Sequence, residues 1–280
     1  MTYDEACERF AAWILADKKR RRPDSLYCVG ITGTIGRGKT VFSQKIIEAL
    51  NRRRIGPPLR ALARSLDDYY LPRAARYKPE FLARGYNPPG ISNRGPAGTH
   101  DVELLRRTMR DLEAWLADRA APHPGVDIPS FDKQADDRST QPFHLDRRID
   151  IFVLEGWFIG AAAPRDSMPI PPGLKRSVAI ALADYQPIFE RLDALWAFDP
   201  VSMDEIIRQR QDQQLTLNRQ TGRLGMAPGQ IERFVRYFYE DSWARPWTSP
   251  EPPAERVSFW ASMDGSRRLV ETRAGPRAFD

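Results

Sequence analysis

The chain has 280 residues, of which 41% are hydrophobic and 29% charged, and its 43 basic and 37 acidic side chains give a formal net charge of +6. These proportions exclude a wholly disordered or fibrous protein, and the positive charge suits an anionic partner. No apolar run approaches the ~20 residues needed to span a bilayer, and the first residues are acidic where a signal peptide would be basic. A cytoplasmic protein without a membrane partner is therefore expected.

Residues 1–25 are predicted to form an amphipathic helix that ends in a basic run. Phe10 and Trp13 lie on its apolar face, and residues 18–22 read Lys-Lys-Arg-Arg-Arg. Cations at a helix C-terminus complement its dipole, so we expect this run to be a solvated helix end. No basic stretch is interleaved with aromatic residues as in single-strand-binding proteins, and nucleic acid is not an expected partner.

A β-loop-α-β unit comes next. The pattern of apolar residues predicts a buried strand at 27–32, a helix at 39–53 and a second strand at 60–66. The two cysteines, Cys7 and Cys28, are too few for a disulfide scaffold or a four-ligand metal site. We expect both to be reduced, with Cys28 in a core strand.

Helices and strands continue to alternate along the rest of the chain. A helix is predicted at 101–118, with Thr99 as its N-cap, whereas residues 176–191 leave helix and strand open. The other expected elements are strands at 149–154, 194–198, 257–262 and 267–272, helices at 203–218 and 229–240, and long loops at 85–98 and 164–173. This order predicts an α/β fold, a doubly wound, mostly parallel sheet in a single domain spanning 1–280.

A phosphate-binding loop joins the first strand to the next helix. Residues 33–40 match G-x-x-x-x-G-K-[ST] in the strand-to-helix context that the mechanism requires. The residues expected to contact ATP are Gly33, Thr34, Ile35, Gly36, Arg37, Gly38, Lys39, Thr40 and the adjoining Val41. Backbone N–H groups of such a loop surround the β-phosphate, the lysine reaches the β- and γ-phosphate oxygens, and the hydroxyl of Thr40 holds Mg²⁺.

Carboxylates follow two of the predicted strands. Asp67 and Asp68 stand at the carboxyl end of the second strand, where an acid can accept a proton from a substrate hydroxyl. Glu155 ends the apolar strand at 149–154 and is expected to bind Mg²⁺ directly or through water. The chain has no Asn-Lys pair, which argues against a switch GTPase, and no cluster of cysteines and histidines indicates a transition metal.

These motifs together resemble the D-glycerate 3-kinase family, within the wider group of phosphoribulokinase, uridine kinase and pantothenate kinase. The resemblance is scattered over about 30–240, and Arg-Gly-Pro-Ala-Gly-Thr-His-Asp at 94–101 is its most discriminating part. The other matching segments are the phosphate loop, residues 65–71 continuing to Arg76, residues 129–133 with Asp137 and Arg138, and residues 154–157. It implies a P-loop fold with a helical lid at 203–226 and acceptor-side loops at 85–101 and 129–145.

The resemblance also implies roles for individual residues. Asp67 would be the general base, with Asp68 as its rival, and Arg210 a lid arginine that neutralises charge on the phosphoryl group. The residues that would line the acceptor or the transferring phosphate are Asp68, Tyr70, Arg76, Arg94, Thr99, His100, Asp101, Asp132, Lys133 and Arg138. An arginine clamp suits an anionic acceptor such as glycerate, because its planar fork pairs with a carboxylate.

Two positions depart from the family's Trp-Arg-x-x-Gln-Glu pattern around Arg210. Gln209 stands in place of Trp and Gln214 in place of Glu, and the turn at 222–226 carries an extra residue. These departures leave the acceptor open. Besides a D-glycerate kinase, a kinase for pantothenate, a nucleoside or another polyol remains possible, as does a non-catalytic nucleotide-binding regulator. The cofactors expected are ATP and Mg²⁺, the substrate is a small anionic hydroxylated metabolite, and the oligomeric state is open.

Overall fold

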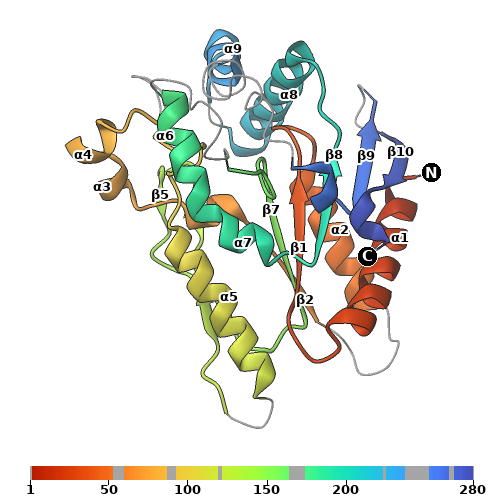
Figure 1. The fold of residues 1–280 in the computed structure, drawn as a ribbon. Helices are drawn as coiled ribbons and strands as arrows, with labels where there is room; N and C mark the ends of the chain where they lie inside the picture. Colours follow the sequence, from red (N-terminus) through yellow and green to blue (C-terminus); the bar gives the residue numbers. More distant parts are fainter. Residues whose placement is uncertain are drawn as a thin grey trace.

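A six-stranded sheet forms the centre of the computed structural model, which describes residues 2–52, 60–86, 93–118, 122–163, 174–222, 225–236, 252–264 and 268–279 (Figure 1). In sheet order the strands are β10 (Leu269–Ala274), β9 (Phe259–Met263), β8 (Ala194–Phe198), β1 (Tyr27–Thr32), β7 (Ile151–Gly156) and β2 (Ala61–Ser65). Every neighbouring pair is parallel except β10 with β9. The expected mostly parallel α/β sheet is confirmed.

Helices cover both faces of this sheet (Figure 1). One face packs against α1 (Tyr3–Arg21) and α2 (Lys39–Arg52), and the other against α5 (Val102–Ala117), α6 (Leu174–Ala181) and α7 (Gln186–Glu190). Successive side chains of a strand point to opposite faces. In β1, Tyr27, Val29 and Ile31 accordingly join the core under α1 and α2, while Cys28 joins the other core.

The remaining elements lie around the carboxyl ends of the strands. Helices α8 (Met203–Thr221) and α9 (Pro228–Arg236) lie beyond the ends of β1 and β8, at the top of Figure 1. The segment predicted as an acceptor-side loop at 129–145 instead contains short antiparallel strands. These are β4 (Phe131–Asp132) paired with β5 (Asp137–Arg138), and β6 (Phe143–Leu145) paired with β3 (Val126–Ile128).

Element boundaries differ from the sequence predictions at several places. The N-cap of α5 is Asp101, whose Oδ1 accepts a hydrogen bond from the Leu104 N–H, so the prediction of Thr99 was wrong. Thr99 is fully buried, and its hydroxyl donates to the Pro96 carbonyl instead. Residues 176–191 are helical, through α6, a 3-10 turn (Leu182–Tyr185) and α7. The loop at 164–173 lies outside the described residues.

Lys18 departs from the expectation of a solvated basic run. Its side chain is buried at the end of α1, and its Nζ donates to the carbonyls of Arg22 and Ser25 at 2.8 Å and of Pro23 at 3.3 Å. A positive group at a helix C-terminus can satisfy carbonyls that lack helical partners. Lys18 therefore fixes the chain between α1 and β1, whereas the next residue, Lys19, is exposed.

No helix in the described part of the chain is both long and apolar enough to cross a membrane.

Replacing Lys18 tests this cap. Lys18→Met keeps the apolar stem but leaves the carbonyls without their charged donor, so the free energy of unfolding should fall by about 2–3 kcal/mol in urea denaturation. Lys19→Met, the matched exposed control, should change it by less than about 0.5 kcal/mol. Equal effects of the two substitutions would contradict the assignment.

Candidate active site

The phosphate loop connects β1 to the N-terminus of α2. Gly36 and Gly38 have φ values of +86° and +74°, which disfavour residues with a Cβ. A Cβ on Gly36 would also lie 2.9 Å from the Cβ of Gln209 in α8, so this glycine permits the close approach of helix and loop. The hydroxyl of Thr34 is buried and lacks a hydrogen-bond partner. Loop shape, helix N-terminus and this free hydroxyl all fit a nucleotide phosphate.

Lys39, Thr40 and Glu155 lie together beside the loop. Thr40 Oγ1 donates to Glu155 Oε1 at 2.9 Å, and Lys39 Nζ donates to the Thr34 carbonyl at 3.1 Å. Burial lowers the pKa of Lys39 while the charges of Glu155 and Asp67 oppose that shift. Burial raises the pKa of Glu155, against the charge of Lys39.

A hydroxyl and one carboxylate fit Mg²⁺, which is bound through one or two carboxylates together with substrate phosphates. No group of three or more acidic, histidine or cysteine side chains able to enclose a metal occurs among the described residues. Thr40 and Glu155 would thus hold the ion together with phosphate oxygens.

Arg37 and Val41, two of the expected ATP contacts, have different surroundings. The Arg37 side chain is fully buried, and its positive charge adds to the lowering of the pKa of Lys39 that burial mainly causes. Val41 is 52% exposed on α2. Arg37 is therefore within electrostatic reach of the phosphate-loop lysine, whereas the Val41 side chain lies at the surface.

Asp67 and Asp68 occupy a 3-10 turn (Leu66–Tyr69) directly after β2, and their side chains differ in role. Asp68 Oδ2 accepts a hydrogen bond from the Ser65 N–H at 3.2 Å, closing a capping box in which Ser65 Oγ accepts from the Asp67 N–H. Asp68 thereby stabilises the turn. Asp67 is left to face the site, where its Oδ2 lies 2.6 Å from Lys133 Nζ.

The ion pair with Lys133 controls the ionisation of Asp67. Burial by itself would raise the pKa of Asp67, but the charge and hydrogen bond of Lys133, with a further hydrogen bond from Tyr70, lower it to about 2. The Asp67 carboxylate raises the pKa of Lys133 in return. Asp67 is consequently ionised at neutral pH and within electrostatic reach of Lys39.

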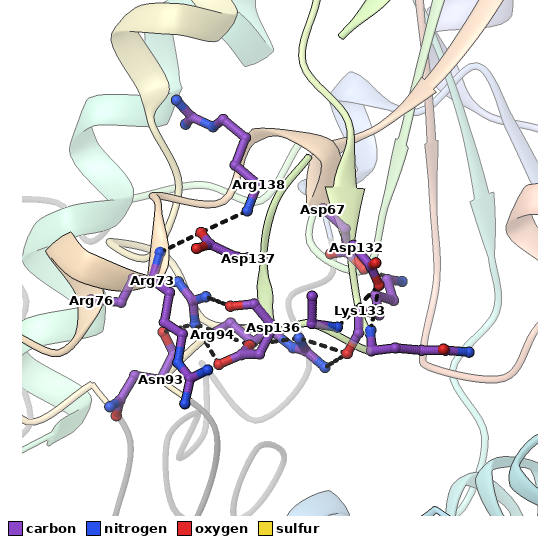
Figure 2. A network of polar contacts seen from close by, with 12 residues as sticks. Asp67, Arg73, Arg76, Asn93, Arg94, Asp132, Lys133, Asp136, Asp137 and Arg138 are labelled. Atoms are coloured by element: carbon purple, nitrogen blue, oxygen red, sulfur yellow. Dashed lines mark hydrogen bonds and ion pairs between the residues drawn. The ribbon is translucent and has the colours of Figure 1, made fainter. Parts of the chain in front are cut away.

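Asp136 organises the loop that carries Lys133 (Figure 2). Its carboxylate pairs with Arg94 at 2.6 Å and with the fully buried Arg76 at 3.2 Å, and it accepts a hydrogen bond from Tyr77. Arg94 also donates to the Lys133 carbonyl at 3.3 Å. Asp136 adopts φ +53°, a conformation that Asp tolerates better than most residues. Sequence reasoning missed this residue.

Several other residues that were expected to bind the acceptor substrate instead contact other groups of the protein. Arg138 donates to the Tyr70 carbonyl at 2.9 Å and pairs with Asp101, the N-cap of α5. Asp132 accepts from the N–H groups of Gln134 and Ala135. With Arg76, Thr99 and Asp68, these residues shape the site through contacts within the protein.

His100 lies beside Tyr70, with the two rings stacked at 4.3 Å between centroids. The imidazole is only 5% exposed, and burial lowers its pKa to about 3. Its neighbour Tyr70 hydrogen-bonds Asp67, so His100 belongs to the same cluster as the candidate base.

Arg210 reaches the site from α8. Its guanidinium donates to Gln214 Oε1 at 3.1 Å, and Gln214 in turn donates to Asn218 at 2.8 Å. Burial, and after it the positive charge of Arg94, lowers the pKa of Arg210. The two arginines are thus within electrostatic reach of each other, and the hydrogen-bond partner of Arg210 is the neutral amide of Gln214. Of the two departures from the family pattern, Gln214 holds Arg210 without neutralising it and Gln209 packs on Gly36.

The structure thus brings together Lys39, Thr40, Asp67, Glu155 and, from the acceptor side, Tyr70, Arg94, His100, Lys133 and Arg210. Positive side chains outnumber carboxylates in this set, which suits anionic ligands.

Removing Lys133 tests the control of Asp67. Lys133→Met removes the interactions that mainly offset the burial of Asp67, so its pKa should rise from about 2 to above the ordinary value of ~3.9. Carboxyl ¹³C titration by NMR measures it directly. Lys78→Met, an exposed lysine outside the cluster, should leave that pKa in place. An unchanged Asp67 titration in Lys133→Met would refute the ion pair.

Comparisons with known proteins find relatives that are described as kinases. No family model matches the chain. A protein of Schizosaccharomyces pombe described as the uncharacterized kinase mug58 is 26% identical over 235 residues, covering 79% of this chain and 82% of that protein. The probable ATP-dependent kinase TDA10 of Saccharomyces cerevisiae is 30% identical over 136 residues, covering 46% of this chain and 44% of that protein.

Solved structures share the fold over nearly the whole chain. D-glycerate 3-kinase from Cryptococcus neoformans has a TM-score of 0.75 at 21% identity, covering 96% of this chain and 99% of its own. The YGR205w protein has a TM-score of 0.74 at 20% identity, covering 98% and 99%. The chain therefore has the fold of the P-loop kinases and, over most of its length, is similar in sequence to proteins described as kinases.

Proposed function

We propose that this protein is a P-loop kinase that transfers the γ-phosphoryl group of ATP to a hydroxyl of a small anionic acceptor, D-glycerate. The observation that carries the proposal is the ionised Asp67 carboxylate at the end of β2, within electrostatic reach of the phosphate-loop lysine Lys39. Such a pairing puts a proton acceptor for the hydroxyl next to the group that binds the transferring phosphate.

Asp67 first orients the acceptor. An ionised carboxylate accepts a hydrogen bond from the hydroxyl and directs its oxygen towards the γ-phosphorus. As the new P–O bond forms and the bond to ADP breaks, the hydroxyl proton becomes acidic and passes to Asp67. A carboxylate with a low pKa suffices, because the transition state is loose and the proton moves late.

Cations then compensate the charge on the transferring group. Lys39 contacts the phosphates from the loop, while Arg94 and Arg210 approach from the acceptor side and from α8. Fixed positive groups in a partly buried site stabilise the developing charge without reorganising. Mg²⁺, when held by Thr40 and Glu155, would neutralise charge on the β- and γ-phosphate oxygens.

Two observations support a hydroxy acid as the acceptor. Arg94, Arg210 and Lys133 supply positive charge beside Asp67, which suits a carboxylate on the substrate. The Arg-Gly-x-x-Gly-Thr-His-Asp segment at 94–101 and the shared fold with a D-glycerate 3-kinase favour glycerate among such acids.

An acceptor screen tests the proposal. ATP consumption with Mg²⁺ is measured over hydroxy acids, polyols, pantothenate and nucleosides, and the product mass is determined. We expect ADP and a phosphoglycerate from D-glycerate. Turnover with another acceptor alone would overturn the choice of glycerate, and no turnover with any hydroxyl compound would overturn the kinase.

Asp67→Asn tests the base. It should lower kcat by about 10²- to 10⁴-fold while ATP still binds, because the amide cannot take the proton. Asp68→Asn is the matched control: an asparagine oxygen still closes the capping box, so its rate should stay within about tenfold of wild type. A folded, ATP-binding Asp67→Asn protein with wild-type kcat would exclude Asp67 as the base.

A further inference from the structure

The imidazole of His100 has two nitrogens in different surroundings. Nδ1 lies 2.8 Å from the phenol oxygen of Tyr185, whereas Nε2 is buried and has no hydrogen-bond partner. The ring is held between Tyr70, stacked on it at 4.3 Å, and Phe158 at 5.8 Å. A buried polar nitrogen without a partner is costly, and this one belongs to the cluster around Asp67.

Tyr185 determines which nitrogen carries the proton. Its side chain is fully buried, and its oxygen accepts a hydrogen bond from the Gly98 N–H at 3.1 Å. Burial raises the pKa of the Tyr185 phenol, and the backbone N–H groups of both Gly98 and His100 act against that rise. Because the Gly98 N–H already donates to the oxygen, the buried phenol still needs an acceptor for its own proton.

The acceptor for the phenol proton is Nδ1 of His100. Among the described residues, Nδ1 of His100 is the acceptor that the phenol contacts, so Tyr185 O–H donates to Nδ1. A neutral imidazole that accepts at Nδ1 carries its own proton on Nε2.

We propose that Tyr185 is a positioning residue that fixes His100 as the Nε2–H tautomer, so that His100 donates a hydrogen bond to an oxygen of the bound acceptor. This inference rests on the proposed function and narrows its substrate class. The acceptor must carry the hydroxyl whose proton Asp67 takes and, in addition, an oxygen that accepts a hydrogen bond from His100. A hydroxy acid supplies that oxygen as its carboxylate.

The His100 ring that donates this hydrogen bond is neutral at neutral pH. With burial lowering the pKa of His100 to about 3, the ring loses its second proton well below neutral pH. The charge of Asp67 opposes this shift and that of Arg76 adds to it. His100 thus recognises an oxygen by direction rather than by charge, leaving charge compensation to the arginines and Lys133.

NMR of the wild-type protein reads the tautomer without any turnover. The chain has three histidines, and the His100 ring signals are identified by their loss in His100→Gln. Long-range ¹H–¹⁵N spectra should show a protonated Nε2 and an unprotonated Nδ1, and added D-glycerate should shift the Nε2 proton. A proton on Nδ1, or a charged ring at neutral pH, would overturn the inference.

Tyr185→Phe tests the consequence for the acceptor. Without the phenol, both tautomers become accessible, and the KM for D-glycerate should rise about three- to tenfold while the KM for ATP stays unchanged. Tyr27→Phe is the matched control, because Tyr27 is equally buried and its hydroxyl also donates a hydrogen bond, to Asp17. Tyr27 is the first residue of β1, at the end of the strand away from the phosphate loop. It should lower stability without changing either KM.

A double-mutant cycle separates positioning from a general loss of structure. In His100→Gln, which keeps an N–H donor but not Nδ1, adding Tyr185→Phe should not raise the D-glycerate KM further. An equal rise in the KM for ATP, or an additive effect in the double mutant, would overturn the role of Tyr185.

The same measurements distinguish the inference from the proposed function. If no acceptor is phosphorylated although His100 carries its proton on Nε2, the proposed function fails and the substrate part of the inference fails with it. If D-glycerate is phosphorylated but the proton is on Nδ1, the inference alone fails.

Discussion

The pairing of β7 with both β1 and β2 is the constraint on which the site depends. Glu155 is level with Ile31 on one side and with Ser65 on the other. Because all three strands are parallel, the segments that follow them start from the same edge of the sheet. Backbone pairing of these strands therefore brings the phosphate loop, Glu155 and the turn carrying Asp67 to the same edge of the sheet.

Features encoded over short stretches were predictable from the sequence. The phosphate loop and Glu155 follow apolar strands and are recognised by type and spacing. The sequence did not show which of Asp67 and Asp68 stays free to face the site, because this depends on which carboxylate closes the capping box on Ser65. The predicted start of α5 was wrong for a similar reason, because the side chain that caps the helix is Asp101 and not Thr99.

Asp136, Tyr185 and Lys18 have roles that were not predicted from the sequence, the first two through contacts distant in the chain and Lys18 through a local fold of the backbone. Asp136 joins Arg76 and Arg94, which precede it by 60 and 42 positions, and Tyr185 meets His100 across 85. Lys18 looked like part of a solvated basic run, yet a turn folds back over it and buries it. A charged or aromatic residue takes such a role only when the fold supplies its partner, so composition and periodicity could not identify it.

The proposed reaction requires Asp67 to contact the hydroxyl that is phosphorylated. The most direct test is a crystal structure with Mg²⁺, a non-hydrolysable ATP analogue and the preferred acceptor. We expect an Asp67 carboxylate oxygen within hydrogen-bond distance of an acceptor hydroxyl whose oxygen is in line with the γ-phosphorus of the analogue. A hydroxyl that instead meets Asp68, or an acceptor bound away from the end of β2, would contradict it.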